Sequence, residues 1–343
     1  MAIELKPKLE FYTIELVSKD KEYKTFRDFT VDELYERRPS SDAQIMNKLY
    51  DHFMNNLATD LAKSSKVKKQ LKFIRTSSNK YLSFKPTVDI SSNIISGVIS
   101  GGRFGRYGMM SDSKATVDDA NAFGKDKTIL RYYYFLLYLP LDHNVGCLMI
   151  HSNSKEESIT DVFKHYISKL FKRGHYEAPS LKVFCPKSFQ EEFQKGAIIK
   201  SLEVSNTYLD SIFTEDNMHT NEQLYDVKIE IRPRGDDGIS LLDGKEKVVK
   251  LLKQLGFIRS TQQKDSLDEF KNKKMTIRNV TQKSDRTFDL DDDEVNIIPV
   301  VYLENHINNY YDDDTPNFDD LNTYCRKLFN DEILPDIRPD LFV

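Results

Sequence analysis

Two neighbouring segments that are apolar on both faces constrain the fold of this chain more than any other feature. Residues 129–139 and 145–151 are dominated by Ile, Leu, Val, Tyr and Phe, and Pro140-Leu-Asp-His-Asn144 joins them. A strand with apolar side chains at consecutive positions, rather than at alternate ones, is covered on both faces. We therefore expect these segments to form a central pair of buried strands.

The other predicted elements come in groups, without a regular alternation of strand and helix. Helical spacing of apolar residues predicts helices at residues 42–61, 161–172, 245–255 and 318–329. Strands are expected at residues 9–17, 71–75, 81–84, 88–99, 181–185, 197–204, 224–232, 275–280 and 296–303, and loops at 100–128 and 206–223. This order predicts an α+β fold with mainly antiparallel sheets and flanking helices. We expect an N-terminal region, residues 1–178, and a C-terminal region, residues 179–343.

Composition and cysteine usage predict a soluble protein of a reducing compartment. Charged residues make up 30% of the 343 residues, and the longest apolar stretch, residues 132–141, is far shorter than a membrane span. Cys147, Cys185 and Cys325 are odd in number and widely spaced, so they imply no disulfide framework. The N-terminus lacks the features of a secretory signal. We therefore expect a cytoplasmic protein without membrane insertion.

Charge is distributed unevenly along the chain. The formal net charge is -4, yet residues 285–343 contain sixteen acidic and four basic residues. Residues 63–85 hold eight basic residues and no acidic one. A run of like charge is either a solvated face or a surface for a partner of opposite charge. The acidic end could pair with the basic run, screen it, or dock a basic partner.

Glycines are concentrated immediately after the basic run. Five of the thirteen glycines lie in Ser96-Gly-Val-Ile-Ser-Gly-Gly-Arg-Phe-Gly-Arg-Tyr-Gly108. Glycine allows positive φ and close approach of the backbone to another molecule, although the same composition is found in loops that are simply mobile. The spacing fits neither a phosphate-binding P-loop nor a dinucleotide fingerprint. Arginines alternating with aromatic residues could clamp phosphates and stack on bases.

These two features together predict a protein that binds DNA or RNA and needs no cofactor. The expected contact residues are lysines of the basic run and charged or aromatic residues of the glycine-rich segment. They are Lys63, Lys66, Lys68, Lys69, Lys72, Arg75, Arg103, Phe104, Arg106 and Tyr107. The basic side chains would contact backbone phosphates, and Phe104 and Tyr107 would stack on bases.

Two alternatives from other classes remain open at this point. Asp226, Lys228 and Glu230 would share one face of a strand, so a Mg²⁺-dependent nuclease is one alternative. The other is a protein–protein interaction module or homo-oligomer, in which the acidic end docks a basic partner. No histidine or cysteine pattern has the spacing of a metal site.

Residues 132–151, Tyr-Tyr-Tyr-Phe-Leu-Leu-Tyr-Leu-Pro-Leu-Asp-His-Asn-Val-Gly-Cys-Leu-Met-Ile-His, are followed by Ser158-Ile-Thr-Asp-Val-Phe163. This block resembles a strand–turn–strand–helix unit of uncharacterised bacterial proteins associated with phage defence and mobile elements. The resemblance carries no family name and no catalytic residues. It implies a possible context, bacterial antiviral defence.

Overall fold

The chain forms two compact units, and the mainly antiparallel α+β fold expected from the sequence is confirmed. The computed structural model describes residues 7–37, 39, 41–74, 79–110, 121–125, 127–153, 158–189, 197–211, 222–232, 239–240, 272–279, 284–290, 295–296 and 301–342. The first unit is Met1–Val183 together with Tyr302–Val343, and the second is Phe184–Val301. The division differs from the expected boundary at residue 178, because the C-terminal segment belongs to the first unit.

The first unit is built on one antiparallel sheet. Its strand order is β10 (Leu181–Val183), β1 (Lys8–Glu15), β9 (Val145–Ser152), β8 (Arg131–Tyr138), β5 (Ile94–Arg103), β3 (Lys69–Lys72) and β2 (Lys63–Ser64). In addition, β4 (Thr87–Asp89) pairs with β5, and β17 (Val301–Tyr302) pairs with β1. The expected central pair is confirmed, because β8 and β9 are buried neighbours in the middle of the sheet.

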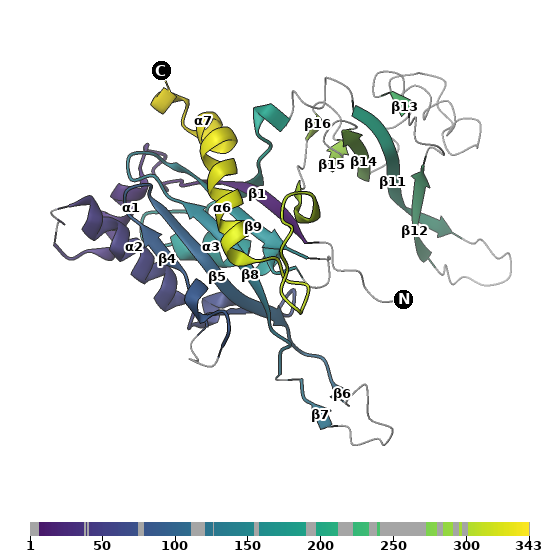
Figure 1. Cartoon of the computed structure of the whole chain (residues 1–343), viewed down its shortest axis with the longest axis horizontal. Helices are drawn as coiled ribbons and strands as arrows, with labels where there is room; N and C mark the ends of the chain where they lie inside the picture. Colours follow the sequence, from purple (N-terminus) through teal and green to yellow (C-terminus); the bar gives the residue numbers. More distant parts are fainter. Residues whose placement is uncertain are drawn as a thin grey trace. The chain divides into compact units, whose positions relative to one another are not determined.

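Helices cover both faces of this sheet (Figure 1). One face packs against α1 (Phe26–Leu34), α2 (Asp42–Asn56) and α3 (Thr160–Phe171), and the other against α6 (Phe318–Leu328) and α7 (Leu334–Ile337). Successive side chains of a strand point to opposite faces. Phe135 thus joins the apolar cluster of the first face, whereas the Tyr134 hydroxyl donates to Asn322 Oδ1 of α6 at 2.7 Å. The apolar character of β8 on both sides follows from these two coverings.

Local sequence signals set the beginnings of the first two helices. Thr25 and Asp28 form a capping box at α1. Ser41 accepts a hydrogen bond from the Gln44 amide at the start of α2. The helix expected at residues 42–61 ends earlier, at Asn56, because Thr59 accepts a hydrogen bond from the Leu61 amide and begins a separate 3₁₀ turn, η1 (Asp60–Ala62).

The second unit contains a six-stranded antiparallel sheet. Its order is β12 (Glu222–Ile231), β11 (Ala197–Ser211), β14 (Asn272–Asn279), β15 (Ser284–Leu290) and β16 (Val295–Asn296), with β13 (Ile239–Ser240) paired to β11. The loop expected at 206–223 is wrong at residues 206–211 and 222–223, because the β11–β12 ladder continues to Ser211 opposite Glu222; residues 212–221 lie outside the described residues. In the first unit, the strand expected at residues 81–84 is wrong, since Leu82–Phe84 is a 3₁₀ turn. The helix expected at 245–255 lies outside the described residues.

Candidate nucleic-acid interface

The glycine-rich segment is not one loop, contrary to expectation. Gly97, Gly101 and Gly102 belong to β5, and Gly108 begins β6 (Gly108–Met110). Strand β6 pairs with β7 (Asn121–Phe123) to form a two-stranded antiparallel ribbon. Gly97, Gly101 and Gly102 lie in a strand despite their turn-like composition, because β5 pairs with β8 on one side and with β3 on the other.

At two of these positions the structure shows why glycine is needed. A Cβ atom at position 102 would lie 2.0 Å from the carbonyl oxygen of Ile129, so only glycine fits this close approach. Gly105 has a φ of +85°, and its amide donates to the carbonyl of Lys125 at 2.9 Å. These contacts join the two chain segments that lead into and out of the ribbon. We call residues 103–107, 124–125 and 127–129 the root of the ribbon.

The basic run and the arginine-bearing segment lie side by side. Lys69 of β3 is opposite Arg103 of β5, and the Phe104 amide donates to the Lys68 carbonyl at 2.9 Å. The ammonium nitrogen of Lys63 lies over the Phe104 ring. The exposed cations Lys63, Lys66, Lys68, Arg103 and Lys125 therefore surround one end of β3 and the root. We call these five residues the basic corner.

Lys125 was missed by the sequence reasoning. It follows Gly124 in a polar segment with no local feature that distinguishes it, and only the Gly105–Lys125 hydrogen bond brings it to the corner. Within the part of the chain that the structure describes, no ion pair involves any of the five side chains of the basic corner. Their charge is therefore directed to solvent.

The other predicted contact residues have different positions. Lys69 is only 7% exposed, and its ammonium group donates to the Ser158 carbonyl at 2.5 Å. Its side chain therefore points into the protein and not to solvent. Lys72 is exposed further along β3. Arg106 and Tyr107 are exposed in the root, where the Tyr107 side chain is 68% exposed. Arg75 lies outside the described residues.

The ring of Phe104 is not fully accessible for stacking on a base, contrary to expectation. Its side chain is half-buried, and Lys63 covers one of its faces with the ammonium nitrogen 4.7 Å from the ring centre. A cation over an aromatic ring is attracted by the ring's negative face. In this structure Phe104 holds a lysine in place.

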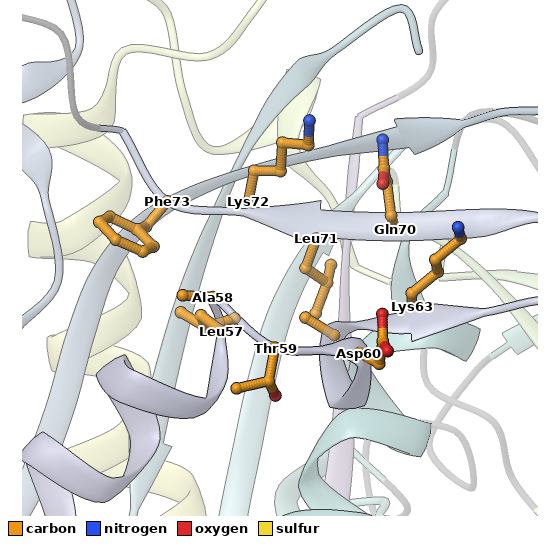
Figure 2. Close-up of a pocket in the computed structure, with 10 residues that line it drawn as sticks. Leu57, Ala58, Thr59, Asp60, Lys63, Gln70, Leu71, Lys72 and Phe73 are labelled. Atoms are coloured by element: carbon orange, nitrogen blue, oxygen red, sulfur yellow. The ribbon is translucent and has the colours of Figure 1, made fainter. Parts of the chain in front are cut away.

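A hollow of about 680 Å³ lies beside the basic corner, between β3 and the segment that follows α2 (Figure 2). Its lining includes Leu57, Thr59, Asp60, Lys63 and Leu71. Figure 2 shows Lys63 and Asp60 at one end and Leu71 directed toward Thr59. Apolar, polar and charged side chains all contribute to its lining.

Two aspartates of the acidic C-terminal segment, Asp313 and Asp340, form ion pairs within the first unit. Asp313 lies 3.5 Å from Lys80 and accepts a hydrogen bond from the buried Tyr81 hydroxyl. Arg338 binds both Asp142 and Asp340. Neither of these two aspartates pairs with a residue of the basic corner.

The residues of the nuclease alternative, Asp226, Lys228 and Glu230, stand at alternate positions of β12. The Lys228 ammonium group is 2.8 Å from Glu203, and Arg232 is 2.8 Å from Glu230. A hydrogen bond from Arg232 lowers the pKa of Glu230. Within the described ranges, no group of three or more His, Cys, Asp or Glu side chains could hold a metal ion.

The chain matches no protein-family model, no curated protein and no solved structure. Among the described residues, none of the helices combines the length and the apolar composition needed to cross a bilayer. No known protein therefore indicates a function for this chain, and the proposal below is argued from the geometry of the first unit.

Proposed function

We propose that this protein binds DNA or RNA through the basic corner, chiefly by contacts to backbone phosphates. The single observation that carries the proposal is the gathering of the exposed cations Lys63, Lys68 and Arg103, from β2, the β2–β3 turn and the end of β5, around one end of β3. Residues that are up to 40 positions apart in the chain thus bring exposed cations to the same end of the sheet, and none of them has an ion-pair partner among the described residues.

The chemistry of this patch suits a polyanion with regularly spaced charges. Lysine and arginine side chains that neutralise phosphates release condensed counterions, which makes the affinity fall steeply with salt. Such contacts position the protein on the nucleic acid but do not read its sequence. Arg103 can also bind a phosphate with two parallel hydrogen bonds, because its guanidinium group is planar.

A charge-reversal series tests the proposal. The variant Lys63→Glu, Lys68→Glu, Arg103→Glu is compared with wild type for binding to fluorescent DNA and RNA oligonucleotides between low and moderate salt. We expect at least a tenfold loss of affinity and a shallower slope of log K against log[salt], by about one for each phosphate contact removed. The matched control is Lys21→Glu, Lys172→Glu, Arg173→Glu, which changes the net charge equally at exposed positions outside the corner.

Equal losses of affinity in the two triple variants would mean that only net charge matters and would refute a specific surface. The absence of any binding by the wild-type protein would refute the proposal itself.

The resemblance of residues 132–163 supports extending the proposal to bacterial antiviral defence. The extension predicts that cells expressing the wild type resist phage and that cells expressing the corner variant do not.

A further inference from the structure

The hollow between β3 and the segment that follows α2 has two chemically different ends (Figure 2). Phe73 lies at one end, and Lys63 and Asp60 lie at the other. Lys63 is opposite Gln70 in the β2–β3 pairing, and Gln70 is three positions before Phe73, so the ends are about 10 Å apart along this stretch of chain. The volume of about 680 Å³ falls within the range that holds small ligands.

The Phe73 end presents apolar surface. Leu57 and Leu71 are 3% and 2% exposed, and the ring of Phe73 is half-buried. Ala58 adds only a methyl group to the lining. Aromatic side chains in nucleic-acid-binding proteins offer faces on which nucleobases stack, whatever the base. This end therefore suits a flat, uncharged ring system.

The other end presents two opposite charges that do not neutralise each other. Lys63 and Asp60 are both exposed. Among the residues that the structure describes, neither side chain forms an ion pair, and the Asp60 carboxylate has no hydrogen-bond partner. An ammonium group only donates hydrogen bonds, and a carboxylate only accepts them. A ligand that satisfies both carries an anionic group beside hydroxyl or amino donors.

We propose that the hollow binds a ribonucleotide that has a 5′-phosphate and free 2′- and 3′-hydroxyls, either as a free molecule or at the 3′ end of RNA. The base lies against Phe73, the two hydroxyls donate to the Asp60 carboxylate, and the phosphate contacts Lys63. Carboxylates also bind ribose hydroxyls in dinucleotide-binding folds. Because Lys63 also belongs to the basic corner, this inference rests on the proposed function and narrows its ligand.

The Asp60 carboxylate is the group that selects this ligand. Within a nucleic-acid strand the 3′-oxygen is part of a phosphodiester, and the charge of Asp60 would repel a second phosphate beside it. Deoxyribose lacks the 2′-hydroxyl, the group that lets a protein distinguish RNA from DNA. An RNA strand that ends in the hollow has its preceding phosphates beside Lys63, where Lys68 and Arg103 of the basic corner also lie.

The first experiment compares labelled oligonucleotides that differ at the last nucleotide. One sequence is prepared as RNA with a free 3′ end, as RNA with a 3′-phosphate, as RNA with a 2′-deoxy last nucleotide, and as DNA. We expect the free RNA end to bind at least tenfold more tightly than each of the others, since each of them loses a hydrogen bond to a charged group. Equal affinity for all four would overturn the inference and leave the proposed function standing. No binding of any of them would refute both.

Unlabelled AMP distinguishes the two sources of the ribonucleotide. Displacement of the RNA by AMP at a similar concentration assigns the hollow to the free nucleotide, and displacement only at a much higher concentration assigns it to the RNA end. 2′-Deoxy-AMP should compete less well than AMP. Equal competition by both nucleotides, or by neither, would overturn the inference.

A tryptophan placed in the hollow reports its occupancy. The chain contains no tryptophan, so Phe73→Trp supplies a single fluorophore and keeps an aromatic face for the base. We expect RNA with a free 3′ end to quench this fluorescence. The matched control Tyr23→Trp, at an exposed position outside the hollow, should be unaffected. Bound RNA that leaves the fluorescence of Phe73→Trp unchanged would contradict the proposed position of the base.

Asp60→Asn tests the role of the carboxylate, because it keeps the size of the side chain and removes its charge. We expect the preference for the free RNA end over the 3′-phosphate end to fall at least tenfold. Asp51→Asn changes the net charge equally at an exposed position on α2 and should keep the preference. Circular dichroism and the thermal midpoint verify that both variants are folded. An unchanged preference in folded Asp60→Asn would overturn the inference.

Discussion

The ammonium nitrogen of Lys63 lies 4.7 Å from the centre of the Phe104 ring. Lys63 begins the edge strand β2, and Phe104 follows the last residue of β5, so this contact spans β3 and joins the edge of the sheet to the root of the ribbon. A half-buried ring thereby fixes the position of an exposed cation. In the proposed function, this preorganisation reduces the entropy that Lys63 loses when it binds a phosphate.

Replacement of Phe104 tests this role of the ring. Phe104→Leu removes the cation–π attraction, which contributes about 0.5–1 kcal/mol at exposed sites, so we expect roughly a twofold to fivefold loss of affinity for nucleic acid. Phe104→Tyr retains the ring face and should bind like the wild type. Fluorescence anisotropy at fixed salt measures both. A loss with Phe104→Tyr equal to that with Phe104→Leu would argue against the attraction as the cause.

The sequence was sufficient to predict the core of the first unit because the signal there is local. The consecutive apolar residues of 133–139 require cover on both faces, and the structure provides α3 on one side and α6 on the other. The helix expected at 161–172 is confirmed as α3. In each case the local spacing of apolar residues indicates which side chains become buried.

The candidate site was harder to predict because its geometry depends on distant partners. Gly102 is required by the carbonyl oxygen of Ile129, and neither residue indicates the other in the sequence. Lys68 and Lys69 are adjacent and chemically equal, yet the register of β3 turns Lys69 inward together with Leu71 and leaves Lys68 exposed. Strand alternation around Leu71 is the one signal that could have separated the two lysines.

Arg338 should stabilise the attachment of the C-terminal segment to the sheet. Its side chain is 4% exposed and forms paired hydrogen bonds of 2.8 and 2.9 Å with Asp142, as well as bonds with Asp340. Because the two carboxylates remain partly hydrated, we expect Arg338→Met to lower the free energy of unfolding by about 2 kcal/mol, less than the cost of orphaning a fully buried charge.

Urea unfolding of the first unit, followed by tyrosine fluorescence, measures this effect. Arg338→Lys is the informative comparison, because lysine keeps the charge but cannot bind two carboxylates with a planar fork. We expect Arg338→Lys to be destabilised as well. A stability of Arg338→Met equal to that of the wild type would show that the cluster contributes nothing.

His151 should make stability depend on pH. Burial lowers its pKa to about 4, and neither ring nitrogen has a hydrogen-bond partner in the structure. Below the ordinary value of about 6.5, the unfolded chain therefore binds a proton that the folded protein does not, and stability falls as the pH decreases. The contribution is complete above about pH 6.5 and is lost by about pH 4, with a maximum of about 3 kcal/mol.

The unfolding free energy of wild type and His151→Leu, measured at several values between about pH 7 and pH 5, tests this expectation before most carboxylates titrate. The variant should lose less stability over this interval. Some dependence should remain, because burial also lowers the pKa of His52, which contributes with the same sign. Parallel curves for the two proteins would contradict the assignment to His151.

The connectivity of the first unit predicts that the second unit can be removed. The chain leaves the first unit with Val183 opposite Tyr12 of β1 and returns where the Leu303 amide donates to the Pro7 carbonyl. Pro7 and Tyr12 are five positions apart, so the two ends lie about 17 Å from each other along β1. A flexible Gly-Ser linker of about ten residues has an average end-to-end distance that matches this separation.

Replacement of Phe184–Val301 by this linker should give a folded protein that unfolds cooperatively and keeps the nucleic-acid affinity of the basic corner. The matched control is a truncation after Val183, which also removes Tyr302–Val343. We expect the truncated chain to aggregate, because the loss of α6 exposes the sheet face that carries Tyr134 and Tyr138, which are buried in the whole chain. Cooperative folding of the truncation would show that the C-terminal segment is not an integral layer of the first unit. Failure of the linked variant to fold would show that the first unit depends on the second.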